Sequence, residues 1–155
     1  MSFQITALEP ESFARLFELS DEALAEHLAV RVIADAKPGF PCRVSLADAE
    51  IGDEVILVNH QHLADASPYR ATHAVYVRRG VDRARPAVGE TPPALLPRTL
   101  SLRAFDDRGM MVATDLVEGE ALAPALDRLL ADPAAAYVHI HYARAGCYAA
   151  RADRA

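Results

Sequence analysis

The stretch RTLSLRAFDDRGMMVATDL, residues 98–116, decides the fold class. Its two flanks, Arg98–Phe105 and Met110–Leu116, are typical of strands, and the four residues Asp106-Asp107-Arg108-Gly109 between them are typical of a hairpin turn. Strands joined by so short a connector pair antiparallel. The stretch therefore predicts a sheet that is antiparallel rather than one built from parallel strands with crossover helices.

The segments on either side extend this pattern. After it, residues 120–131 carry leucines at helical spacing and end before Pro133, and two further strands are joined by Ala143-Arg144-Ala145-Gly146. Before it come several short strands and two helices, the second capped by Ser20. These earlier elements are strands over residues 3–7, 30–34, 42–46, 54–59 and 74–78, and helices from Pro10 and over residues 21–28.

Together these elements predict one α+β domain over residues 1–155. Its sheet is mostly antiparallel, with two N-terminal helices and one helix before the last β-hairpin. Residues 80–97 interrupt the pattern, because they contain four prolines and two glycines. We predict a Pro-rich surface loop there.

The composition limits the environment and the partners. The net charge is −6 with the histidines neutral, which argues against binding to nucleic acid or to an anionic membrane. No apolar run reaches the length of about 18 residues that a membrane span needs. The first residues, MSFQITALEPESF, contain no basic segment followed by an apolar one, so we expect no export signal. We therefore expect a cytoplasmic protein whose two cysteines are reduced.

Four stretches carry a family resemblance: ADAKPGFPCRVSLADAEIGDEVILVNHQH (34–62), SPYRATHAVYVR (67–78), LSLRAFDDRGMM (100–111) and YVHIHYARAGCYAARADR (137–154). They resemble, in the same order, an uncharacterised bacterial family catalogued as domain of unknown function 1203. The segments GCYAAR and PCRVSL are the most specific parts of the resemblance. It implies a compact, single-domain bacterial protein. It implies no activity and no catalytic residue, so every candidate site is inferred from the residues themselves.

The histidines form the first candidate site. His139 and His141 lie one residue apart on a predicted strand, so both side chains point to one face of the sheet. His60 and His62 repeat this spacing on another strand, and His73 lies at the start of a third. Imidazole nitrogens are common ligands of Zn, Fe and Ni, so a divalent transition metal is one interpretation. In the alternative, His60 and His62 lie in a solvated loop and the other pair forms local hydrogen bonds. The metal candidates are His139, His141, His60 and His73.

Arginines beside small polar residues form the second candidate site. The planar guanidinium group suits carboxylates and phosphates, so two or three converging arginines would make an anion pocket. The segment SPYRATH, residues 67–73, brings a hydroxyl, a phenol, a guanidinium and an imidazole into one loop. In the alternative, the arginines form structural salt bridges with aspartates. The anion-binding candidates are Arg70, Tyr69, His73, Arg103, His141 and Arg144.

Cys147 is the third candidate. If its strand forms a hairpin with the strand of His139 and His141, its thiol would lie near an imidazole, which is the minimum for a reactive thiolate. The alternative is a small buried core residue, which is the commoner environment of cysteine.

Three functions fit these residues. The first is a small cytoplasmic domain that binds an acidic small molecule or anion. The second is a metal-dependent enzyme with His-x-His ligands. The third is a structural or partner-binding homodimer. The sequence requires no cofactor, and it lacks the phosphate-binding G-x-x-x-x-G-K-[ST] and G-x-G-x-x-G motifs and the G-x-S-x-G elbow, which disfavours nucleotide hydrolysis, dinucleotide-linked redox chemistry and the common serine hydrolases.

Overall fold

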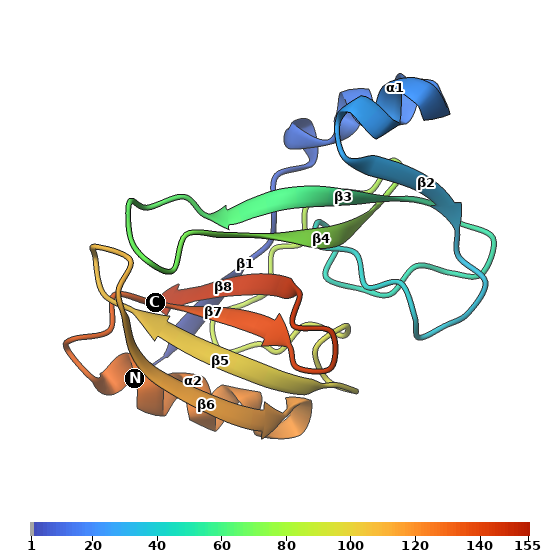
Figure 1. Cartoon of the computed structure of the whole chain (residues 1–155). Helices are drawn as coiled ribbons and strands as arrows, with labels where there is room; N and C mark the ends of the chain where they lie inside the picture. Colours follow the sequence, from blue (N-terminus) through green and yellow to red (C-terminus); the bar gives the residue numbers. More distant parts are fainter. Residues whose placement is uncertain (1) are drawn as a thin grey trace.

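The computed structural model describes residues 2–155 and arranges their strands in two antiparallel sheets above one helix (Figure 1). The predicted fold class, a single α+β domain with antiparallel pairing, is confirmed. The elements are β1 (Phe3–Thr6), η1 (Pro10–Ser12), η2 (Ala14–Glu18), α1 (Asp21–Glu26), β2 (Ala29–Ile33), β3 (Glu54–Leu63), β4 (Ala71–Arg78), β5 (Thr99–Phe105), β6 (Met111–Glu118), η3 (Gly119–Ala121), α2 (Leu122–Ala131), β7 (Tyr137–Tyr142) and β8 (Tyr148–Arg154).

The larger sheet has five strands in the order β1-β8-β7-β5-β6, and α2 covers one of its faces (Figure 1). The helix forms there because its leucines make one apolar stripe, which becomes fully buried only against a second apolar surface. The sheet supplies that surface through alternate residues of β5 and β7. The main contributors are Leu122, Leu126 and Leu130 of α2, Leu100 and Leu102 of β5, and Val138 and Ile140 of β7.

The smaller sheet has three strands in the order β2-β3-β4 and lies over the other face of the five-stranded sheet (Figure 1). Ile56 and Val58 of β3 pair with Val77 and Val75 of β4, and all four side chains are buried. They pack against the N-terminal turns in one apolar cluster. One face of the smaller sheet therefore looks toward the face of the larger sheet that α2 does not cover.

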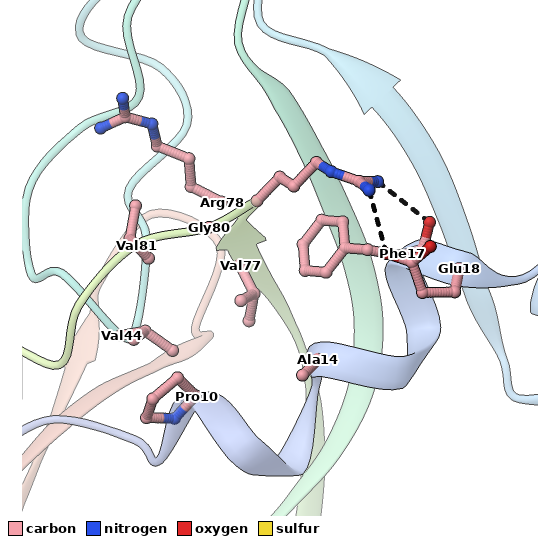
Figure 2. A pocket seen from close by; sticks show the side chains of 10 residues that line it. Pro10, Ala14, Phe17, Glu18, Val44, Val77, Arg78, Gly80 and Val81 are labelled. Atoms are coloured by element: carbon pink, nitrogen blue, oxygen red, sulfur yellow. Dashed lines mark hydrogen bonds and ion pairs between the residues drawn. The ribbon is translucent and has the colours of Figure 1, made fainter.

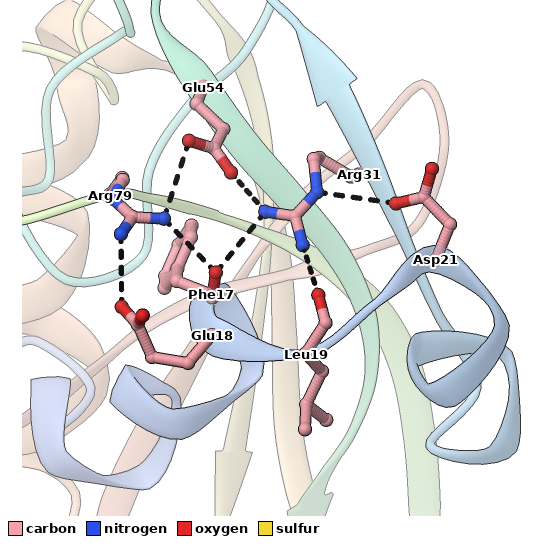
Figure 3. A network of polar contacts seen from close by, with 7 residues as sticks. All are labelled: Phe17, Glu18, Leu19, Asp21, Arg31, Glu54 and Arg79. Atoms are coloured by element: carbon pink, nitrogen blue, oxygen red, sulfur yellow. Dashed lines mark hydrogen bonds and ion pairs between the residues drawn. The ribbon is translucent and has the colours of Figure 1, made fainter.

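An ionic network fixes the N-terminal turns to the smaller sheet (Figure 3). Arg31 of β2 contacts the carboxylates of Glu54 and Asp21 and donates hydrogen bonds to the backbone carbonyls of Phe17 and Leu19. Arg79, at the end of β4, donates to the same Phe17 carbonyl and pairs with Glu18. These arginines therefore satisfy backbone groups that the short turns leave without a partner.

The N-terminal helices are shorter than the sequence pattern predicts. The segment after Pro10 forms two 3-10 turns, η1 and η2, and the second helix, α1, ends at Glu26 after six residues. Ser20 caps α1 as predicted, because its hydroxyl accepts a hydrogen bond from the amide of Ala23. Leu28 then takes a left-handed backbone conformation with φ 53°, which ends the helical segment before β2.

Residues 42–46 form a turn, so the strand predicted there is wrong. Cys42, Val44 and Leu46 are buried as the alternation suggests, but the Leu46 amide donates to the Cys42 carbonyl and Leu46 has φ 52°. Only a single bridge joins Cys42 to Tyr76 of β4. The apolar side chains enter the core from a folded loop, which produces the same alternation as a strand.

Residues 80–97 contain neither helix nor strand, and they reach into the molecule at Ala94 and Leu95, which are fully buried. There the backbone approaches Gly119 so closely that a Cβ atom on this glycine would lie 2.2 Å from the Leu95 carbonyl oxygen. In the described part of the chain, no helix is long and apolar enough to cross a membrane.

Candidate functional site

The face of the five-stranded sheet that is turned away from α2 carries polar side chains. His139 and His141 of β7 alternate with Val138 and Ile140, which pack toward α2, so the imidazoles must point toward the smaller sheet. On β5, Arg103 is the register partner of His139, and Ser101 is the partner of His141. This pairing places one guanidinium group on the same face as the two imidazoles.

The smaller sheet turns His62 toward these two rings. The centroid of the His62 ring lies 5.5 Å from that of His139 and 5.0 Å from that of His141. His73 of β4 stacks on His62 at 4.7 Å and lies 5.2 Å from His141. Two His-x-His segments from different sheets therefore meet between the sheets, with a fifth histidine at one side.

Three of these histidines have the arrangement of a metal site. His62, His139 and His141 each offer a ring nitrogen, and the three nitrogens lie within 4.8 Å of one another. Each ring also has one buried nitrogen without a hydrogen-bond partner: Nδ1 of His62, Nδ1 of His139 and Nε2 of His141. Buried polar atoms in folded proteins almost always have partners, so three such atoms at one place call for an explanation.

Hydrogen bonds hold two of these rings in place. Nδ1 of His141 lies 2.9 Å from the carbonyl oxygen of Gly146, and because a carbonyl only accepts, Nδ1 carries the proton. In the neutral ring this leaves a lone pair on Nε2, the nitrogen without a partner. Nε2 of His62 lies 2.8 Å from Nδ1 of His73, and one of these nitrogens donates to the other. In metal sites, a hydrogen bond of this kind to the ring nitrogen that does not bind the metal commonly fixes the orientation of the imidazole.

Burial keeps the clustered histidines neutral. Together with a smaller contribution from neighbouring positively charged groups, it lowers the pKa of both His139 and His141 to about 3 and that of His62 to about 4. Arg103 acts in this way on all three. It is half-buried and forms no ion pair with a carboxylate within residues 2–155. Neutral imidazole is the form that binds metals, so the ligand atoms are ready at physiological pH.

Tyr148 of β8 closes the cluster on one side. Its ring stacks on His62 at 5.1 Å with an interplanar angle of 9°, and it meets His139 edge to face at 5.1 Å. It is buried. The sequence gives no sign of this role for Tyr148, because an aromatic residue on a predicted strand is indistinguishable from an ordinary core residue.

The structure separates His60 from the metal candidates. Its ring packs on Phe13 and Tyr148, at 5.8 Å and 6.3 Å, and its place in the cluster is taken by His62. A bulge in β3 between Gln61 and Leu63 shifts the register near the end of this strand. The spacing His-x-His alone predicts that both residues share a face, but it does not predict which one reaches the other sheet.

The six anion-binding candidates lie in three separate places. Arg103, His73 and His141 lie together in the histidine cluster. Arg70 is exposed, and its side chain donates to the Asp65 carbonyl within its own turn. Its neighbour Tyr69 packs edge to face on Phe105 of β5.

Arg144 and Cys147 lie at the other end of β7 and β8 and line a separate cavity. Cys147 is half-buried and forms no hydrogen bond to a histidine in residues 2–155, whereas Cys42 is fully buried. The hairpin was expected to bring the Cys147 thiol close to an imidazole. Instead, it is the carbonyl of the preceding residue, Gly146, that contacts the ring of His141.

Another cavity, of about 400 Å³, lies between η2 and the end of β4 (Figure 2). Its walls include Phe17 and Val77, and its charged groups are already paired: Arg79 with Glu18, and Arg78 with Asp53. Among the described residues that line this cavity, none has an unmatched charge or an unpartnered buried atom, so the cavity offers less for a ligand than the histidine cluster does.

The model of one protein family, described as protein of unknown function (DUF1203), matches residues 39–154. This span is three quarters of the chain, and it includes the four clustered histidines, His60 beside them, Arg103 and Tyr148. Comparisons with the curated proteins and with the solved structures gave no significant match. The resemblance seen in the sequence is thereby confirmed, and the chain belongs to the DUF1203 family.

Proposed function

We propose that this protein binds one divalent transition-metal ion through His62, His139 and His141. The observation that carries the proposal is the convergence of three ring nitrogens, together with an unpartnered buried nitrogen on each of the three rings. Two of the rings, those of His139 and His141, are almost completely buried, with 3% and 0% of their surface exposed. A metal ion would provide the partner that the described residues do not provide.

The donor set fits a first-row transition metal. Imidazole nitrogens suit Zn²⁺, Cu²⁺, Fe²⁺ and Ni²⁺, whereas Mg²⁺ and Ca²⁺ need oxygen ligands. The carbonyl of Gly146 behind His141, and His73 behind His62, would supply the supporting hydrogen bonds that such sites use. Three protein ligands leave one position of a tetrahedral ion for water or substrate, which is the arrangement of catalytic rather than structural zinc.

The charge around the site favours an anion at that remaining position. Three neutral imidazoles leave the charge of a divalent ion unbalanced, and Arg103 adds a further positive charge without a carboxylate partner in residues 2–155. Arg103 is the register partner of His139, so its guanidinium group starts from the same face of the sheet. We propose that the site accepts a small acidic molecule, with its anionic group between the metal and Arg103.

Metal content tests this proposal directly. Untagged protein purified without chelator should contain about one equivalent of metal per chain, or should take up one equivalent of Zn²⁺ after removal of metal with a chelator. Zn²⁺ at a hundred times its Kd should raise the free energy of unfolding by about 2.7 kcal/mol.

The variants His62→Ala and His141→Ala should lose this uptake. His27→Ala, at the exposed end of α1, is the matched control and should retain it. His60→Ala is a second control, because His60 lies beside the three ligands without belonging to them. Retention of stoichiometric metal by both cluster variants, or no binding of Zn²⁺ by the folded wild-type protein, would exclude this site.

A further inference from the structure

The cavity lined by Arg144 and Cys147 has a volume of about 510 Å³ and lies beside the turn between β7 and β8. Its size is within the range of small-molecule sites, which is about 300–1,000 Å³. Three arginines line it: Arg43 from the turn before β3, Arg98 from the start of β5 and Arg144 from the turn between β7 and β8. Prolines and two tyrosines make up much of the remaining wall.

Arg43 is a buried cation without a counter-ion. Only 2% of its surface is exposed, and its Nε and Nη1 atoms donate to the carbonyls of Tyr148 and Pro41, at 2.8 Å and 2.6 Å. Its guanidinium group also lies over the ring of Tyr142, 4.9 Å from the centroid. No carboxylate in residues 2–155 pairs with it. An isolated buried charge is unfavourable, and a nearby anion would offset that cost.

The neighbouring charges do not neutralise Arg43. Arg98 forms a two-pronged ion pair with Asp48, at 2.6 Å and 2.8 Å, so the charges of this pair cancel. Arg144 is exposed at the cavity and forms no ion pair within residues 2–155. Two unmatched positive charges, one at the buried end and one at the exposed side, therefore remain on the cavity, although the whole chain has a net charge of −6.

We infer that this cavity is a binding site for a small organic anion whose carboxylate or phosphate group lies between Arg43 and Arg144. The planar guanidinium groups provide the donors for that group, because their fork of N–H groups matches the oxygens of a carboxylate or phosphate. The ring or chain of the ligand would lie along Pro41 and Pro97 on the wall of the cavity. This site is separate from the histidine cluster and does not depend on metal.

Cys147 offers a way to observe binding at this site, because it lines the cavity while Cys42 has no exposed surface. The rate at which neutral iodoacetamide modifies Cys147, followed by intact mass, therefore reports whether the cavity is filled. The probe is phenyl phosphate, which carries both an anionic group and a ring. Inorganic phosphate tests the anionic group without a ring, and benzyl alcohol tests a ring without charge. Sodium chloride keeps the ionic strength constant in all samples.

Phenyl phosphate should slow this reaction in a saturable manner, and inorganic phosphate should do so more weakly, while benzyl alcohol should have no effect. Arg144→Ala should raise the Kd for phenyl phosphate about tenfold, the effect of one charge-assisted hydrogen bond. Arg15→Ala, which removes an equal charge from an exposed position outside the cavity, should leave the Kd unchanged. Arg43→Met should abolish protection if its circular dichroism shows a folded protein.

Four results would overturn the inference. One is modification of Cys147 at an unchanged rate in saturating, millimolar phenyl phosphate. Another is an equal loss of affinity in Arg144→Ala and Arg15→Ala, which would show attraction to net charge only. A third is equal protection by benzyl alcohol, which would show an apolar site. The fourth concerns metal. Protection that persists after removal of metal with a chelator supports a site independent of the histidines, whereas its loss would place the anion at the histidine cluster instead.

Discussion

The ring of His62 on β3 meets the ring of His141 on β7 edge to face, with centroids 5.0 Å apart. The two residues belong to different sheets, and neither has a carboxylate that shifts its pKa. They belong to a group of neutral imidazoles between the two sheets, with the guanidinium group of Arg103 beside it. This arrangement has consequences for stability as well as for binding.

Acid should destabilise the metal-free protein through its buried histidines. Burial lowers the pKa of His139 and of His141 from 6.5 to about 3, so the unfolded chain takes up protons on these rings at a higher pH than the folded chain does. The free energy of unfolding should therefore fall as the pH decreases from 6.5 toward 3, by up to about 1.4 kcal/mol per pH unit for each ring. Urea denaturation at pH 7.0, 5.5 and 4.5 in the presence of chelator would measure this.

The double variant with His139→Leu and His141→Leu separates this effect from general acid denaturation. It should lose stability less steeply than the wild-type protein between pH 6.5 and pH 4.5, because the two titrating groups are gone. Equal slopes in the two proteins would show that other groups cause the acid sensitivity.

His73 should act as a positioning residue for the metal ligand His62. Its Nδ1 lies 2.8 Å from Nε2 of His62, and the two rings stack. Removal of such a supporting contact typically weakens metal affinity about tenfold to a hundredfold. We expect His73→Ala to raise the Kd for Zn²⁺ by about this factor while the stoichiometry stays at one. Competition with a chromogenic chelator measures the Kd, and His60→Ala is the control. A Kd equal to that of the control would contradict the role.

Gly119 should not tolerate a side chain. A Cβ atom there would lie 2.2 Å and 2.4 Å from the carbonyl oxygens of Leu95 and Leu96, so the backbone of the buried loop would have to move. We expect Gly119→Ala to lower the free energy of unfolding by about 3 kcal/mol. Gly39→Ala is the matched control, because its nearest contact would be an ordinary 3.4 Å to the Ala36 carbonyl oxygen. Similar denaturation midpoints for the two variants would be inconsistent with this close approach.

The ion pair between Asp48 and Arg98 should show strong coupling. Burial is the largest single influence on the pKa of Asp48 and would raise it, but the hydrogen bonds and charge of Arg98, the amide of Gly39 and the charge of Lys37 together outweigh burial and lower the pKa. Arg98→Met leaves a buried carboxylate without its partner, which typically costs about 3–5 kcal/mol. We expect the double variant with Asp48→Leu and Arg98→Met to recover part of that loss. Additive effects in a double-mutant cycle of urea denaturations would contradict the coupling.

Much of the local structure could be predicted from the sequence. The turn Asp106–Gly109, the leucine stripe of α2 and the last hairpin each depend on residues close together in the chain. The alternation in β7 also determined that His139 and His141 point away from α2, because Val138 and Ile140 had to be buried on the other side. The turn at Cys42 was missed because buried side chains in a loop give the same alternation as those in a strand.

An α+β domain with antiparallel hairpins and two His-x-His pairs follows from the sequence, since hydrophobic periodicity and turn residues are local properties. The contact of His62, rather than His60, with His139 and His141 arises from the way the two sheets stack. The same packing buries Arg43 against the carbonyls of Tyr148 and Pro41, with no carboxylate partner among residues 2–155. The position of His62 also depends on a bulge in β3, and the packing of the sheets is set by the complementary shapes of side chains that lie far apart in the chain.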